Sequence, residues 1–144
     1  AGPDDGQLQT VQELIARNGL EEQVTLTGLL TGEDVWQAYN SCDLFVLPCR
    51  TDTFPMAIVE ACAAGKSMVV TDTCEIADLL RDKAALVVPV DTRAIAAAMT
   101  RLIQDDEERS LLQAGANELM KSTFSVDAVG DTLEPIYKEA AGEN

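Results

Sequence analysis

The sequence contains no histidine, and this absence removes several classes of catalytic site. Histidine is the usual general base at neutral pH, so a Ser/His or Cys/His nucleophilic pair within this chain is excluded. A zinc site of mixed cysteine and histidine ligands is excluded for the same reason. No C-x-x-C pair exists either, so we predict no metal site and expect the thiols to be small buried hydrophobes of a reducing compartment. The four cysteines are Cys42, Cys49, Cys62 and Cys74.

Basic residues, aromatic residues and long apolar runs are also scarce. Ten lysines and arginines stand against 25 acidic residues, which gives a formal net charge of −15 at pH 7. Nucleic-acid phosphates require a basic surface, so we expect no nucleic-acid partner. The dispersed acids predict a solvated surface, and adaptation to high salt is the alternative explanation for them. No run approaches the ~20 apolar residues that a membrane-spanning helix needs.

The pattern that is present alternates between strand-like and helix-like segments. With 144 residues and 47% apolar content, the chain has room for one domain with a sizeable core. Short β-rich runs alternating with amphipathic helices predict an α/β fold with a doubly wound parallel sheet. The predicted strands are 24–27, 43–47, 67–71 and 84–88, and the predicted helices are 7–17, one beginning at 31–34, 55–65, 76–81, 92–104, 106–121 and 126–140.

The segment 48–65 is the strongest candidate for a binding site. A buried strand ends at Pro48, a polar loop follows, and Pro55 is suited to a helix start. The carboxyl ends of parallel strands bind ligands, and a helix N-terminus attracts phosphate. Asp52 in the loop and Glu60 in the helix are suited to accept hydrogen bonds from sugar hydroxyls, and Glu60 needs a partner because its neighbours are apolar. The alternative is that Asp52 is a turn residue and Glu60 a solvated helix residue.

This segment resembles the glutamate-x7-glutamate signature of the group 1 (family four) retaining glycosyltransferases of the GT-B fold. Other segments resemble the same family in the same order, from residue 1 to about 137. They are Gly2-Pro3-Asp4, Gly19-Leu20 with Val24-Thr25-Leu26-Thr27-Gly28, Asp43-Leu44-Phe45-Val46-Leu47-Pro48, Gly65-Lys66-Ser67-Met68-Val69-Val70-Thr71 and Leu86-Val87-Val88-Pro89-Val90-Asp91.

The resemblance implies that residues 1–144 are a partial C-terminal, nucleotide-sugar-binding domain. Its fold would be a Rossmann-like doubly wound parallel sheet, truncated because the first strands of the usual domain are absent. The expected function is the donor-binding half of a retaining, metal-independent hexosyltransferase, which transfers a sugar from a nucleotide-sugar to a glycan, lipid or small molecule. The nucleotide-sugar is a substrate, and no cofactor is expected.

The same resemblance assigns roles to individual residues. Glu60 would hold the ribose hydroxyls, and Asp52 would contact the donor sugar, although no residue is assigned as catalytic. The remaining contacts would come from the backbone and from a nucleobase pocket. The N–H groups around Thr53, Phe54, Met56 and Ala57 would meet the sugar and diphosphate, and Gly28, Leu29 and Leu30 would border the base.

The sequence also departs from the family pattern. Asp52 is one methylene shorter than the usual glutamate, and Thr53 and Pro55 replace common glycines. The N-terminal acceptor domain is missing, as are two earlier strands that carry a phosphate-binding arginine and lysine. We therefore expect a fragment that is inactive alone, with strand 24–27 separated from the other strands. An exposed sheet edge would then be open to self-association.

The main alternative is a non-catalytic nucleotide-sugar-binding or scaffold module, and a related GT-B sugar-nucleotide epimerase is a further one. The acidic cluster and the downstream threonine and lysine of a flavodoxin-like signalling domain are absent. The expected location is cytoplasmic, or peripheral at the inner membrane in the full-length enzyme.

Overall fold

The computed structural model describes residues 1–142 and divides into two compact units. The first unit comprises Ala1–Ala38, and the second begins at Tyr39. The last two positions of the predicted domain, 143 and 144, lie outside the described residues. In residues 1–142, none of the helices combines the length and apolar character needed to cross a membrane.

The first unit contains one complete helix, α1 (Leu8–Asn18), followed by extended chain. Gly19 ends the helix, because it adopts the left-handed conformation (φ 65°) that glycine tolerates best. The Gly2 N–H donates to the carbonyl oxygen of Gly28 at 2.8 Å, which joins the beginning of this unit to the segment that follows α1. Helix α2 (Glu33–Ser41) contains the boundary between the units.

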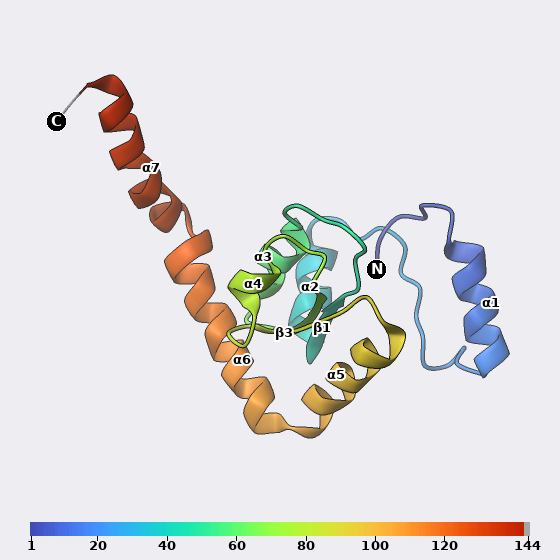
Figure 1. Cartoon of the computed structure of the whole chain (residues 1–144). Coiled ribbons are helices and arrows are strands. Elements are labelled where there is room, and N and C mark those ends of the chain that lie inside the picture. The colour runs from blue at the N-terminus through green and yellow to red at the C-terminus, as the bar shows by residue number, and fades with distance from the viewer. Residues whose placement is uncertain (143–144) are drawn as a thin grey trace. The chain divides into compact units, whose positions relative to one another are not determined.

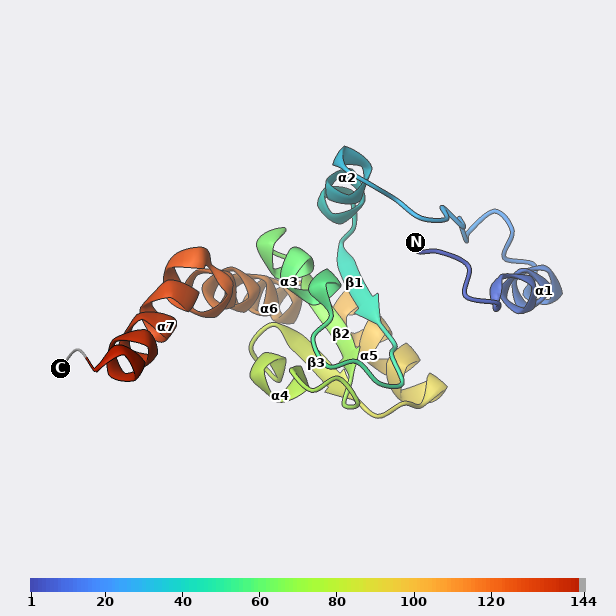
Figure 2. The same cartoon turned by 90° about the horizontal axis from the view of Figure 1, so that it is seen from above.

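The second unit is built around a three-stranded parallel sheet. Its strands are β1 (Leu44–Leu47), β2 (Ser67–Thr71) and β3 (Ala85–Val88), in the order β1-β2-β3. Val46 pairs with Val69, and Val69 pairs in turn with Leu86. Since all three strands run in the same direction, their carboxyl ends lie at one edge of the sheet (Figure 2).

Helices connect and cover these strands, which confirms the predicted doubly wound α/β class (Figure 1). Helix α5 contacts all three strands, whereas α3 and α6 contact the central strand β2. The helices are α3 (Met56–Ala63), α4 (Ala77–Leu80), α5 (Thr92–Gln104), α6 (Asp106–Leu119) and α7 (Val126–Ala141), with a π-helical turn, η1 (Met120–Phe124), between the last two.

Aliphatic side chains from the sheet, α5 and α6 form the main core. Val69 and Leu86 pack with Ala98, Leu102 and Leu112, and all five are buried. Helix α3 buries a second set, Ile58, Ala61 and Cys62. Burying these side chains gives about 1.5–3 kcal/mol for each large aliphatic group, so the sheet and its helices are held together mainly by apolar contact.

The predicted strand 24–27 is wrong, because these residues form no strand in the described part of the chain. A strand is stable only when its backbone pairs with a neighbour, and the described sheet, β1-β2-β3, does not include this segment. Several boundaries also differ from prediction by one or two residues, and two of them bear on the site or on the course of the chain. Pro55 precedes α3 as its N-cap, and α6 ends at Leu119 because the chain widens into η1.

The cysteines follow the prediction in part. All four are free, and Cys62 and Cys74 are buried, but Cys42 and Cys49 are only half-buried. Both half-buried residues flank β1, which lies at an edge of the sheet and is itself half-buried along its length.

Candidate functional site

The candidate site begins where the loops after β1 and β2 meet at the carboxyl edge of the sheet. The Thr71 hydroxyl donates to the carbonyl oxygen of Cys49 at 2.6 Å, and the Thr73 hydroxyl donates to the same oxygen at 2.7 Å. Farther along, the Glu75 N–H donates to the carbonyl oxygen of Asp52 at 3.1 Å. These bonds connect the loop that carries Asp52 to the neighbouring strand's loop.

Asp52 lies in this loop, just before helix α3. Its Oδ1 accepts a hydrogen bond from the Phe54 N–H at 3.2 Å, the geometry of an Asx turn. The family resemblance implies that the Phe54 N–H would meet the sugar or diphosphate of a ligand. In the structure Asp52 occupies it, so a ligand reaches the Phe54 N–H only if the turn opens.

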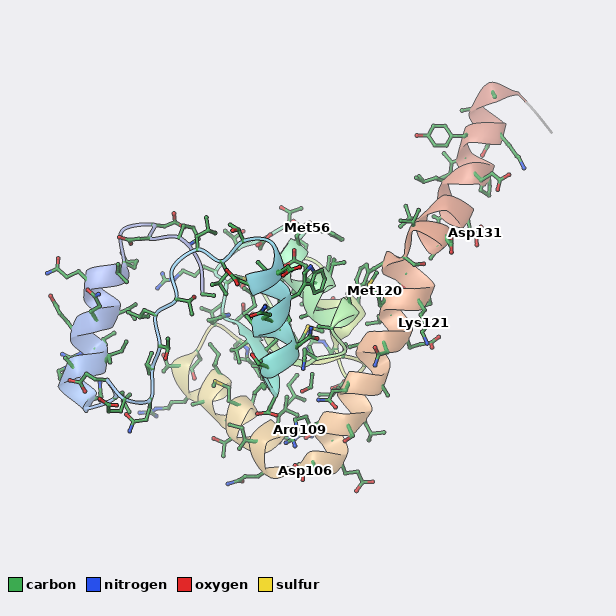
Figure 3. The ribbon with its side chains drawn as sticks, turned by 180° about the vertical axis from the view of Figure 1, so that it is seen from behind. Met56, Asp106, Arg109, Met120, Lys121 and Asp131 are labelled. Atoms are coloured by element: carbon green, nitrogen blue, oxygen red, sulfur yellow. The ribbon has the colours of Figure 1, made fainter. Side chains whose placement is uncertain are left out.

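Within the part of the chain that the structure describes, the Met56 and Ala57 N–H groups in the first turn of α3 have no hydrogen-bond partner. Pro55 has no N–H and caps the helix without a side-chain bond, while the Ile58 N–H donates to its carbonyl oxygen at 3.0 Å. The first N–H groups of a helix have no acceptor within it. Met56, labelled at the beginning of α3 in Figure 3, is 59% exposed, whereas the N-cap residue Pro55 is buried.

Glu60 has the partner that its apolar surroundings require, as predicted. The Tyr39 hydroxyl, from α2, lies 3.0 Å from Oε2 of Glu60 and 3.2 Å from the carbonyl oxygen of Ala57. Burial raises the pKa of Tyr39 above its ordinary value, and the hydrogen bond to the Glu60 carboxylate raises it further. Tyr39 therefore remains a protonated donor at neutral pH.

The sequence pattern did not predict two residues that contact this region, Tyr39 and Phe124. No local pattern singles out Tyr39, because its partner Glu60 is 21 residues away. The ring of Phe124, from η1, lies edge-on to the ring of Phe54, with centroids 6.3 Å apart. The only available signal for Tyr39 was the need of Glu60 for a partner.

The remaining residues that the resemblance assigned to the site lie in two different places in the chain. Thr53 is exposed in the loop before α3. Gly28, Leu29 and Leu30 belong to the first unit, and their role around a nucleobase stays a prediction. Among residues 1–142, no group of three or more histidine, cysteine, aspartate or glutamate residues is arranged to hold a metal ion.

Comparison with known solved structures supports the fold. Sucrose-phosphate synthase from Thermosynechococcus elongatus superposes with a TM-score of 0.83 at 20% identity, covering 100% of this chain and 38% of that protein. Anabaena HepE in complex with UDP superposes with a TM-score of 0.81 at 23% identity, covering 96% of this chain and 39% of HepE. At these identities the likeness shows a shared fold.

Comparison of sequences identifies the family. The chain is 30% identical over 131 residues to alpha-D-kanosaminyltransferase of Streptomyces kanamyceticus, covering 90% of this chain and 34% of that protein. It is also 30% identical over 134 residues to D-inositol 3-phosphate glycosyltransferase of Salinispora tropica, covering 92% of this chain and 28% of that enzyme. The chain thus spans about a third of the length of these relatives. The model of the glycosyl transferases group 1 family matches residues 1–118, and the chain belongs to this family.

Proposed function

We propose that this chain is the donor-binding half of a retaining glycosyltransferase, which transfers a sugar from a nucleotide-sugar to an acceptor. The observation that carries the proposal is the geometry around α3: Asp52 precedes its N-terminus, and Glu60 lies within it, held by Tyr39. Family membership supports glycosyl transfer as the reaction.

Each part of this arrangement suits one part of a nucleotide-sugar. The Met56 and Ala57 N–H groups, together with the helix dipole, favour a diphosphate at the N-terminus of α3. The Glu60 carboxylate accepts hydrogen bonds from ribose hydroxyls, and the Asp52 carboxylate accepts one from the donor sugar. Because HepE is a structural relative with bound UDP, UDP is the first nucleotide to test.

The proposal also covers an acceptor domain, the type of reaction, the location of the protein and its self-association. The chain spans about a third of its relatives, which supports an acceptor domain elsewhere in the same protein. Metal independence, retention of configuration and a cytoplasmic or inner-membrane-peripheral location rest on the family resemblance. Strand β1 lies at an edge of the described sheet, and we propose that it allows self-association, which sedimentation at increasing concentration tests.

Calorimetric titration of the full-length protein separates the two carboxylates. Glu60→Gln keeps the side chain's size but removes its charge, and it should weaken UDP binding by about 1.5–3 kcal/mol. Asp52→Asn keeps an oxygen that can accept from the Phe54 N–H, so the loop should persist. This variant should bind UDP almost normally and transfer sugar more slowly.

Glu118→Gln, an exposed change on α6, is the matched control and should leave both measurements unchanged. Equal UDP affinity for the wild type and Glu60→Gln would contradict the role of Glu60. UDP-sugar binding without any turnover by the full-length protein would instead favour the non-catalytic module.

A further inference from the structure

The hydroxyl of Tyr39 lies between two acceptors but has one proton to donate. Its distances are 3.0 Å to Oε2 of Glu60 and 3.2 Å to the carbonyl oxygen of Ala57. A hydrogen bond to an ionised carboxylate is stronger than one to a neutral carbonyl, so the proton is directed mainly to Glu60. The bond joins α2 to the middle of α3.

Phe45 packs against the Tyr39 ring, and Lys66 holds the end of α2 that carries it. The residue is 9% exposed, and its ring lies against that of Phe45 on β1, with centroids 5.6 Å apart and planes tilted by 50°. The Lys66 ammonium donates to the carbonyl oxygens of Asn40 and Cys42 at 3.2 Å and 2.9 Å, which secures the end of α2 that carries Tyr39. The Tyr39 hydroxyl is therefore held in place where it can donate a hydrogen bond to the Glu60 carboxylate.

From this geometry we propose that Tyr39 is a positioning residue, which holds the Glu60 carboxylate ready for ribose and so sets the preference for ribonucleotides. The inference rests on the proposed function, in which Glu60 binds the ribose hydroxyls. A glutamate side chain loses rotational freedom when it binds a ligand, and a bond made beforehand reduces that loss.

The arrangement also leaves the carboxylate able to accept from a ligand. Tyr39 contacts Oε2 of Glu60, and a carboxylate has about four lone-pair positions in all. A ribose with two neighbouring hydroxyls can therefore bind without displacing Tyr39. A dideoxyribose offers neither hydroxyl, so it gains nothing from an ordered Glu60.

The test is the ratio of affinities for a ribonucleotide and its dideoxy analogue. UDP, ADP and GDP are titrated into the full-length wild-type protein, and the tightest is compared with its 2′,3′-dideoxy counterpart. Tyr39→Phe keeps the ring against Phe45 but removes the hydroxyl. It should weaken binding of the ribonucleotide about 2- to 13-fold, the scale of one net hydrogen bond, and leave binding of the dideoxy nucleotide unchanged.

Two further variants complete the design. Tyr137→Phe removes a hydroxyl from an exposed ring on α7 and should leave both affinities unchanged. In the Glu60→Gln background, Tyr39→Phe should have a smaller effect than in the wild type, because the two residues act through one bond.

The outcomes separate this inference from the proposed function. If Glu60→Gln lowers the ratio but Tyr39→Phe does not, the role of Tyr39 is overturned and the proposed function stands. An equal loss of both affinities in Tyr39→Phe would mean a purely structural residue and would also overturn the inference. If no nucleotide binds the wild type, or Glu60→Gln leaves the ratio unchanged, both proposals are overturned.

Discussion

The Thr71 hydroxyl and the Cys49 carbonyl oxygen lie 2.6 Å apart and join the ends of two adjacent strands. Thr71 is fully buried at the end of β2, and Cys49 follows β1 by two residues. The Thr73 hydroxyl donates to the same carbonyl, which has two lone pairs and can accept both. This pair of bonds anchors the beginning of the loop that carries Asp52.

Replacing Thr71 by valine should therefore destabilise the fold. The substitution keeps the branched shape but removes a buried donor, and we expect a loss of about 1–2 kcal/mol in the free energy of unfolding. Urea denaturation followed by circular dichroism measures it. Thr100→Val is the control, since the Thr100 hydroxyl bonds to the Ala96 carbonyl on an exposed helix face. Equal losses in the two variants would contradict the anchoring role of Thr71.

Two glycines within helices should respond to alanine in opposite directions. A Cβ at Gly115, on α6, would overlap the carbonyl oxygen of Lys83, so α6 must approach this backbone closely. Gly115→Ala should cost about 1–3 kcal/mol of stability through overpacking. Gly130, on α7, has open space around it, and Gly130→Ala should stabilise the helix by about 0.5–1 kcal/mol. Thermal unfolding of the two variants measures the change in stability relative to the wild type. A Gly115→Ala protein as stable as the wild type would contradict the close packing of α6.

The stability of the protein should fall at alkaline pH partly through Tyr39. Its pKa is raised above the ordinary value of 10.0, first by burial and then by the Glu60 carboxylate. The folded state therefore holds this proton more tightly than the unfolded state does. The resulting stabilisation is complete below pH 10 and is lost as the pH rises from there toward the folded-state pKa.

Comparison of Tyr39→Phe with the wild type isolates this contribution. The free energy of unfolding of each protein is measured in urea between pH 8 and pH 11. The difference in this free energy between the wild type and Tyr39→Phe should become smaller above pH 10. The Tyr137→Phe control should keep a constant difference from the wild type. If the difference in free energy of unfolding between the wild type and Tyr39→Phe instead becomes larger with pH, the expected pH dependence is contradicted.

The four thiols should react with iodoacetamide in an order set by burial. Burial raises the pKa of the Cys62 thiol from 9.0 to about 11, and burial likewise raises the pKa of Cys74. Since the thiolate is the reactive form, both should resist alkylation of the native protein at pH 8. Half-buried Cys42 and Cys49 should be modified first, as peptide mass spectrometry can show. Early modification of Cys62 would indicate that α3 opens readily.

Much of the second unit follows from local sequence patterns. Continuous apolar runs predicted the three strands, and helical spacing predicted the helices between them, because each pattern matches the period of its own element. The sequence pattern also predicted that Asp52 precedes a helix and that Glu60 lies within it, because both positions depend on the strand–loop–helix order. The need of Glu60 for a partner followed from its apolar neighbours.

The tertiary structure alone decided which groups meet. Tyr39 reaches Glu60 across 21 residues, and no local period encodes that contact. The Asp52 carboxylate takes the Phe54 N–H, which the family resemblance had assigned to a ligand. Segment 24–27 has the composition of a strand but forms none, because strand formation depends on a backbone partner that propensity cannot supply. Local patterns thus determined the elements of this protein, whereas hydrogen bonds between distant residues determined the geometry of its candidate site.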